Sequence, residues 1–212
     1  MTVKSFITTI MVVAATFSIA ATDLFYIEDV FIVPGQTVQV SIMLENETQY
    51  TAFQADLYLP DGLAVEQNSF ALTSRKAADH TLSTSILPNG AIRLMSYSMR
   101  VNPYRGNSGA LVTFKLTASD SLSTPASIAL KRILFTSLTG TEAALNDTQC
   151  TVNTFLPGDV NLDGYVNIKD VTDLIDLLLS GNDTPSYADV NIDNEVNIKD
   201  ITDLIDMLID SN

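Results

Sequence analysis

The stretch GDVNLDGYVNIKDVTDLIDLLLS, from Gly158 to Ser180, returns as ADVNIDNEVNIKDITDLIDMLID from Ala188 to Asp210. Asp159 aligns with Asp189, so the two copies are 30 residues apart. Each copy is a 12-residue loop rich in side-chain oxygens that runs directly into a segment with the apolar spacing of a helix. Oxygen ligands on alternate loop residues are what a hard, large cation such as Ca²⁺ requires.

The first loop contains a full set of candidate calcium ligands. Gly164 at position 6 permits the sharp turn of such a loop, and Tyr165 at position 7 contributes its backbone carbonyl. Asp at position 12 is one methylene shorter than the usual Glu, so the start of the helix must move inward to close the site. The predicted ligands are Asp159, Asn161, Asp163, Tyr165, Asn167 and Asp170.

The second loop repeats these positions. Asn194 replaces glycine at position 6 and is the best other residue for a left-handed backbone. Glu195 at position 7 is expected to contribute its carbonyl and not its carboxylate. The predicted ligands are Asp189, Asn191, Asp193, Glu195, Asn197 and Asp200. The sequence therefore predicts two bound Ca²⁺ ions.

Charge is concentrated in the same region. The net charge is −14 over 212 residues, and the part from Gly158 onward carries −11 of it, with 13 acidic residues against two lysines. Local acidity is expected of a cation site, and a chain without a basic stripe is not expected to bind nucleic acid. One cysteine excludes an intrachain disulfide, and one histidine is too few for a zinc site or a histidine-based triad.

Residues 1–22 have the pattern of a secretory signal peptide. Lys4 precedes a mostly apolar run, and Ser18 and Ala20 supply small residues for cleavage after Ala20. The alternative is an uncleaved membrane anchor, but the run is short for a span. We therefore expect a secreted or cell-surface protein with no membrane span after removal of the signal.

Residues 23–156 alternate apolar and polar side chains between turn signals, which is typical of half-buried strands. Asn89-Gly90 fits a tight hairpin, because both residues tolerate positive φ. Eight or nine short strands without a convincing helix predict an antiparallel β-sandwich. Cys150 is interpreted as a small buried residue of the last strand, and His80 as a solvated loop residue.

Three segments of this domain carry a resemblance. The quoted segments are PGQTVQV from Pro34, AFQADLYLP from Ala52 and GALVTFKL from Gly109. They resemble strands of cohesin-like and carbohydrate-binding-module-like β-sandwiches. The expected organisation is a signal peptide at 1–22, a cohesin-like sandwich at 23–156 and a small α-helical calcium module at 157–212.

The helical segments each carry two stripes of residues. One stripe is expected to form the small core of the module, with members Val171, Leu174, Ile175 and Leu178 and their counterparts Ile201, Leu204, Ile205 and Leu208. The second stripe ends in an apolar residue in both copies. It is either an ordinary solvated face or a face that binds a partner, present twice by pseudo-twofold symmetry.

Residues 158–212 resemble a type I dockerin, because two loop–helix calcium repeats occur without the entering helix of an EF-hand. The resemblance implies a non-catalytic module that binds a cohesin β-sandwich and docks its protein into an extracellular assembly, typically a polysaccharide-degrading one. The implied partner is a cohesin-type protein in another chain or a second copy. Ile168-Lys169 and Ile198-Lys199 replace the Ser-Thr pair common in cellulosomal dockerins.

The implied partner-binding residues occupy loop positions 10 and 11 and the helix beyond. They are Ile168, Lys169, Thr172, Asp176 and Leu179, with Ile198, Lys199, Thr202, Asp206 and Ile209 in the second repeat. An identical Ile-Lys pair in both repeats is what a module able to bind in two orientations would have.

Three other hypotheses stay open. The sandwich could bind glycan through exposed rings, for which Tyr50, Tyr97 and Tyr104 are candidates, with the dockerin as tether. A glycosidase would need paired carboxylates, whereas Asp56, Asp61 and Glu66 are interpreted as surface residues. The acidic module could also fold back on its own sandwich, where the candidate contacts are Arg75, Lys76, Arg93, Arg100 and Arg105.

Removal of calcium is predicted to unfold the module. The carboxylates at positions 1, 5 and 12 of each loop are expected to converge, so they repel one another without the ion. The helical circular dichroism signal should therefore fall in excess chelator and return when calcium is restored. A helical signal that chelator leaves unchanged would rule out this expectation.

Overall fold

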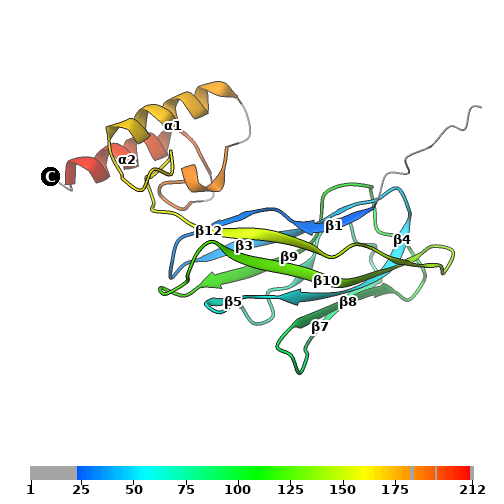
Figure 1. Cartoon of the computed structure of the whole chain (residues 1–212). Helices are drawn as coiled ribbons and strands as arrows, with labels where there is room; N and C mark the ends of the chain where they lie inside the picture. The colour runs from blue at the N-terminus through cyan, green and yellow to red at the C-terminus, as the bar shows by residue number, and fades with distance from the viewer. Residues whose placement is uncertain (1–22, 182–183, 194, 211–212) are drawn as a thin grey trace, which may run out of the picture.

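The computed structural model describes residues 23–181, 184–193 and 195–210. The predicted signal peptide at 1–22 lies outside the described residues, as does Asn194. The described chain forms a two-sheet sandwich followed by a pair of helices, which confirms the predicted fold class (Figure 1). None of the described helices is long and apolar enough to cross a membrane.

The first sheet has the strand order β1-β3-β9-β5, with β6 also paired to β9. Its pairs are all antiparallel. The alternation seen in the sequence sets the register, since Val40, Ile42 and Leu44 all face the core. The bounds are β1 Leu24–Ile27, β3 Thr37–Glu45, β9 Ala110–Ala118, β5 Leu63–Val65 and β6 Ala71–Leu72.

The second sheet has the strand order β2-β12-β10-β4-β8-β7, with β11 paired to β10. Its β12–β2 pair is parallel, and the other pairs are antiparallel. The bounds are β2 Val30–Ile32, β12 Thr148–Thr154, β10 Ala126–Ser137, β4 Tyr50–Tyr58, β8 Ile92–Ser98, β7 His80–Ile86 and β11 Glu142–Ala144.

The chain passes from the first sheet to the second between β1 and β2, across Glu28 and Asp29. The described chain has twelve strands, more than the eight or nine expected, because short edge strands such as β6 and β11 have little alternation to reveal them. The β7–β8 connection is also looser than a two-residue hairpin. In that connection only Gly90 has a positive φ, 82°, so Asn89 does not adopt the expected conformation.

Aromatic rings fill the space between the sheets. Phe25 lies with its ring centroid 5.2 Å from those of Phe53 and Phe135, which come from the opposite sheet. Cys150 is buried in β12 as predicted, and burial raises the pKa of its thiol to about 11. His80 was predicted wrongly as a solvated residue. It begins β7, is buried and stacks on the Tyr104 ring at 4.2 Å, so burial lowers its pKa.

The glycan and glycosidase hypotheses lose support from burial. Of the three candidate rings, Tyr50 and Tyr104 are buried in the core, and only Tyr97 is exposed. Asp56 is not a surface residue but is fully buried, where the guanidinium of Arg93 donates to its two carboxylate oxygens at 2.7 and 2.8 Å. A carboxylate held in such a pair is a structural group.

Arg75 joins the loops at one end of the sandwich instead of pointing to solvent. Its side chain is buried and donates to the backbone carbonyls of Leu44 at 2.6 Å and of Gly109 at 2.8 Å. It also donates to the carbonyl of Arg105 and to Oδ1 of Asn46. It is therefore not available to the acidic module.

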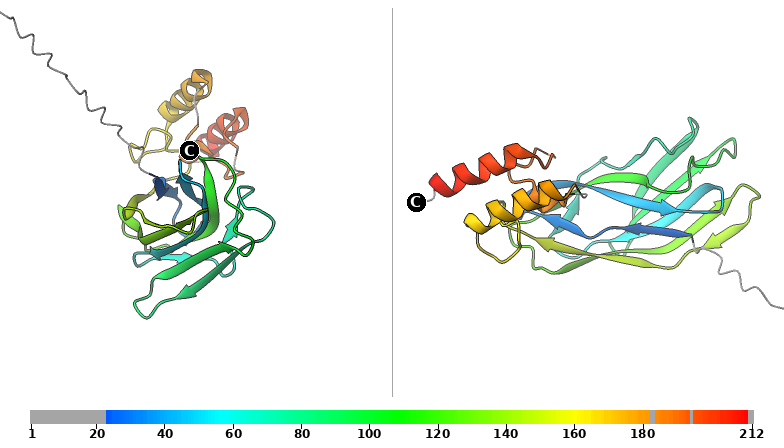
Figure 2. Two further views of the ribbon diagram at one scale, coloured as in Figure 1. Left: turned by 90° about the vertical axis from the view of Figure 1, so that its right-hand side faces the viewer. Right: turned by 90° about the horizontal axis from the view of Figure 1, so that it is seen from above.

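The two helices lie at the end of the sandwich where β12 terminates, and they extend past that end (Figure 2). Helix α1 spans Ile168–Ser180 and helix α2 spans Ile198–Asp210. A single 3-10 turn, η1, covers Ser186–Ala188 before the second loop, where no helix was expected.

Arg75→Met should destabilise the sandwich, because the buried Leu44 carbonyl and the buried Asn46 amide oxygen lose this donor at a cost on the order of 1–3 kcal/mol each. Urea unfolding of the full chain in saturating calcium should show a clearly lower midpoint. The neighbouring Lys76→Met, at an exposed position, is the matched control and should leave the midpoint near that of the wild type. Equal midpoints for the two variants would contradict this role of Arg75.

Candidate calcium loops and exposed helix faces

The side chains at positions 1, 3 and 5 of the first loop hold its backbone in a turn. Asp159 accepts hydrogen bonds from the amides of Asp163 at 3.0 Å and Gly164 at 2.9 Å. Asn161 Oδ1 also accepts from the Asp163 amide, at 2.9 Å, and Asp163 Oδ1 accepts from the Tyr165 amide at 3.0 Å. The side-chain oxygens thus hold the loop backbone in a turn by accepting hydrogen bonds from its amides.

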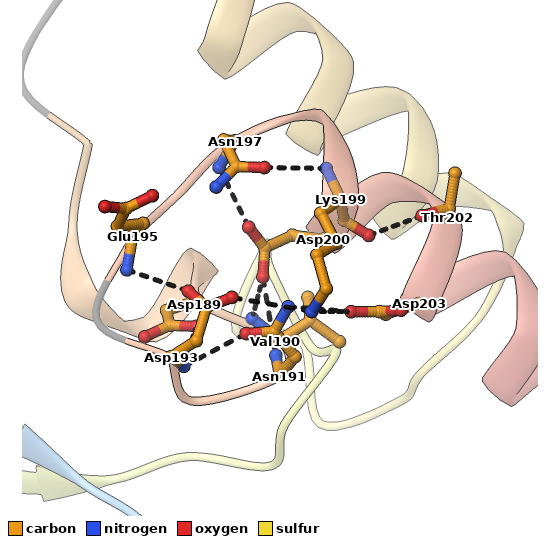
Figure 3. Close-up of polar contacts among 10 residues, drawn as sticks. All are labelled: Asp189, Val190, Asn191, Asp193, Glu195, Asn197, Lys199, Asp200, Thr202 and Asp203. Atoms are coloured by element: carbon orange, nitrogen blue, oxygen red, sulfur yellow. Dashed lines mark hydrogen bonds and ion pairs between the residues drawn. The ribbon is translucent and has the colours of Figure 1, made fainter.

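The second loop repeats three of these four bonds (Figure 3). The Asp193 amide donates to Asp189 Oδ1 at 3.1 Å and to Asn191 Oδ1 at 3.0 Å, and the Glu195 amide donates to Asp193 Oδ1 at 3.0 Å. The Glu195 carboxylate points away from Asp193, in keeping with the expectation that this residue offers its carbonyl (Figure 3).

One fully buried aspartate per repeat ties the start of the loop to the start of the helix. Asp170 Oδ1 accepts from the amides of Val160 at 2.9 Å and Asn161 at 3.2 Å, and its Oδ2 accepts from the Asn167 amide at 2.9 Å. Asp200 makes the equivalent bonds to Val190, Asn191 and Asn197. The short side chain at position 12 therefore reaches the loop because the helix begins directly against it.

The same residues start the helices. Asn167 is the N-cap of α1, where its side chain accepts from the Lys169 amide at 2.9 Å, and Asp170 completes a capping box. In α2 the side chain of Asn197 accepts from the Lys199 amide at 2.8 Å. Loop closure and helix initiation thus depend on one set of side chains.

Position 4 of each loop has a left-handed backbone. Leu162 has φ 58° and Ile192 has φ 59°, and both side chains are exposed. This conformation costs an ordinary residue roughly 1–2 kcal/mol and is rarer still for a β-branched one. Gly164 at position 6 has φ 89°, as its sequence position predicts.

The carboxylates do not converge as expected. In the described part of the chain, no group of three or more Asp, Glu, His or Cys side chains is gathered so as to hold a metal ion. The physical reason is that Asp170 and Asp200 turn to the backbone amides named above. Among the described residues the three carboxylates of a loop are thus not gathered at one point, and the ligand assignment stays a prediction.

Three buried aspartates of the loops form no ion pair with lysine or arginine in the described part of the chain. Among the described residues no ion pair reaches Asp159, Asp170 or Asp200, which are 4%, 0% and 0% exposed. Buried charges in proteins are paired or bind metals. A carboxylate has about four acceptor sites, so Asp159 retains capacity beyond its two hydrogen bonds. The residues present fit a hard cation with oxygen ligands.

The core of the module differs from the predicted stripes at one position in each helix. Leu174 and Leu204 are fully buried and pack with Val160, Val190 and Ala188. Ile175 and Ile205, expected in this core, are 36% and 38% exposed. Leu177, one position off the predicted stripe, packs against the core instead. The helices are rotated so that the isoleucines lie toward the outer face.

All ten predicted partner-binding residues are exposed. Ile168, Ile175 and Leu179 follow helical spacing along one outer face of α1, and Ile198, Ile205 and Ile209 do the same on α2. The exposed fractions reach 70% for Ile168, 76% for Ile198 and 79% for Leu179. Three apolar residues on each face match between the repeats, apart from the last position. Polar residues lie among them, namely Thr172 and Asp176 with their counterparts Thr202 and Asp206.

The structure adds Asp173 and Asp203 to these surfaces. Asp173 accepts from Lys169 Nζ at 2.8 Å and from Asn161 Nδ2 at 3.2 Å, and the Lys169 hydrogen bond is the main cause of its lowered pKa. Asp203 makes the same contacts with Asn191 and Lys199. The sequence contains a signal for this ion pair, because in each copy the aspartate follows the lysine by four residues.

Comparison with known proteins agrees with this geometry. The family described as Dockerin type I domain matches residues 157–209. These residues form a dockerin type I domain. The match covers about a quarter of the chain, and dockerin type I domains generally bind calcium. A search of curated protein sequences found no match to this chain.

The N-terminal sandwich is similar to solved cohesins. A non-cellulosomal cohesin from Archaeoglobus fulgidus is 17% identical with a TM-score of 0.54, covering 66% of this chain and 96% of that one. The sixth cohesin of Acetivibrio cellulolyticus scaffoldin B, solved with a Cel5 dockerin mutant, is 14% identical with a TM-score of 0.54, covering 64% and 100%. A type I cohesin–dockerin complex from Clostridium thermocellum is 12% identical with a TM-score of 0.55, and the match covers 64% of this chain and 100% of that one. The sandwich therefore has a cohesin-like fold.

Leu204→Ala should lower the stability of the dockerin much more than Ile205→Ala, although the two residues are neighbours in the sequence. Leu204 is fully buried, so its truncation should cost about 2–5 kcal/mol, enough to unfold a small module at limiting calcium. Ile205 is partly exposed and should cost much less. The helical dichroism signal, followed against calcium concentration, measures both. A larger effect at Ile205 would show that the helix rotation described here is wrong.

Proposed function

We propose that the protein is a secreted, non-catalytic assembly protein whose dockerin binds calcium and attaches it to a cohesin-type β-sandwich. The observation that carries the proposal is the repeated apolar face on α1 and α2, exposed in both copies. Dockerin and cohesin-like domains are non-catalytic modules. Two of the solved structures similar to the sandwich are cohesins in complex with dockerins.

In this proposal each loop binds one Ca²⁺. The first ion is bound by Asp159, Asn161, Asp163, the carbonyl of Tyr165, Asn167 and Asp170, and the second by Asp189, Asn191, Asp193, the carbonyl of Glu195, Asn197 and Asp200. The ion supplies positive charge beside Asp159, Asp170 and Asp200, which have no ion pair among the described residues. The ligands keep the loop closed, and the closed loop fixes the start and direction of each helix.

The outer helix faces bind the partner. Ile168 and Leu179 of α1 are large apolar anchors, since side chains this exposed lose much water-accessible surface when a partner covers them. Lys169 lies beside them with its pKa raised by the hydrogen bond to Asp173, and it stays charged at the rim of the face. Because α2 presents the same chemistry, either face can make the contact.

The site of action proposed is outside the cell, at a cell surface or in an extracellular assembly that uses polysaccharide. The pattern of residues 1–22 supports export, and calcium is abundant outside cells. The partner is a cohesin-type sandwich in another chain or in a second copy of this chain.

Binding should survive the loss of one helix face but not of both. Ile168→Asp or Ile198→Asp alone removes one of two equivalent orientations, so the affinity should fall by only about twofold. The double variant should lose binding. Titration calorimetry against cohesin-type domains of the same secretome, in calcium, measures this.

The matched control is the double Ile168→Val, Ile198→Val variant, which keeps both positions apolar and should bind like the wild type. Binding that persists in excess chelator, or in the double aspartate variant, would contradict the proposed function.

A further inference from the structure

The dockerin touches its own sandwich through the second repeat. The Tyr187 ring, on η1, meets the Phe31 ring, on β2, with centroids 5.0 Å apart and planes at 61°. Both rings are half-buried. An edge-on contact of this kind is a favourable aromatic geometry. It joins a residue two positions before the second calcium loop to the edge of the second sheet.

A groove of about 290 Å³ continues this contact. The sandwich side includes Phe31 and Phe155, and the dockerin side includes Ser186, Asp189 and Ile192. Among the residues that line it, none belongs to the first loop or to α1. The second repeat therefore faces the sandwich, although the two repeats are nearly identical in sequence.

Ile192 gives this asymmetry a physical basis. Its left-handed backbone directs an isoleucine side chain toward the groove, where apolar groups of the sandwich lie. Leu162 has the same backbone and similar exposure in the first loop but does not line the groove. The strain is therefore common to both loops, and the position of Ile192 against the sandwich is what distinguishes the second loop.

Charge opposes the contact when calcium is absent. Glu28 and Asp29, at the crossing between the two sheets, line the groove together with Asp189 of the second loop. Like charges gathered around one groove disfavour one another. A divalent cation in the second loop offsets that repulsion and fixes the backbone on which Tyr187 and Ile192 are carried.

We propose that the second calcium loop is a joint that holds the dockerin on the β2 edge of its own sandwich, and that calcium in this loop closes the joint. The outer faces of α1 and α2 remain open, so the joint sets the angle at which the sandwich is presented to an assembly. This inference rests on the proposed calcium binding by the second loop.

The test uses the full chain with calcium saturating. Tyr187→Ala and Ile192→Gly should release the dockerin, which small-angle X-ray scattering detects as a larger radius of gyration and nuclear magnetic resonance as shifted amides in Val30–Ile32. The matched controls are Tyr97→Ala, an exposed tyrosine of β8, and Leu162→Gly, which relieves the same backbone strain in the first loop. Both controls should match the wild type.

Calcium titration of the same variants separates the joint from the calcium site. If calcium in the second loop favours the joint, the joint must favour calcium binding by the same factor. Release of the joint should therefore lower the calcium affinity of the second loop by roughly fivefold or more and leave that of the first loop unchanged. Retained calcium binding with scattering profiles equal to the wild type would overturn the joint alone. A wild-type chain that binds no calcium would instead refute the proposed function on which it rests.

Discussion

In each repeat a single carboxylate, Asp170 or Asp200, connects the first residues of a loop to the first turn of a helix. Each of these carboxylates is fully buried and accepts hydrogen bonds from three backbone amides, with lengths of 2.8–3.4 Å. Hydrogen bonds to a charged acceptor are among the strong ones, yet a buried charge without a countercharge is costly. In the proposed function a bound cation offsets this cost, and the helix positions follow from the hydrogen bonds of these aspartates.

These hydrogen bonds help the short dockerin to hold a defined shape. Its apolar core is small, centred on Leu174 and Leu204, and a core of this size supplies little stability by itself. The polar loops supply the remaining order, since they cap both helices and bring Val160 and Val190 under them. Helix faces that would otherwise rotate freely are thus fixed toward solvent.

Much of this organisation could be predicted from the sequence. The strands with clear alternation, such as β3 and β9, and the 30-residue repeat indicate both modules, because period and position set which face is buried. The rotation that exposes Ile175 and Ile205 could not be predicted, since a helix with apolar residues on several sides fits more than one packing. His80 and Asp56 were misassigned because their burial depends on Tyr104 and Arg93, which are distant in sequence. The Phe31–Tyr187 contact has no local signal at all.

The central claim is that each loop binds one calcium ion with the aspartate at position 12, Asp170 or Asp200, among its ligands. Calorimetric titration of Ca²⁺ into the metal-stripped full chain tests it most directly, with Asp170→Asn and Asp200→Asn measured alongside. The account predicts two ions for the wild-type chain and one for each variant. An unchanged stoichiometry in the variants, or no calcium binding by the wild type, would contradict it.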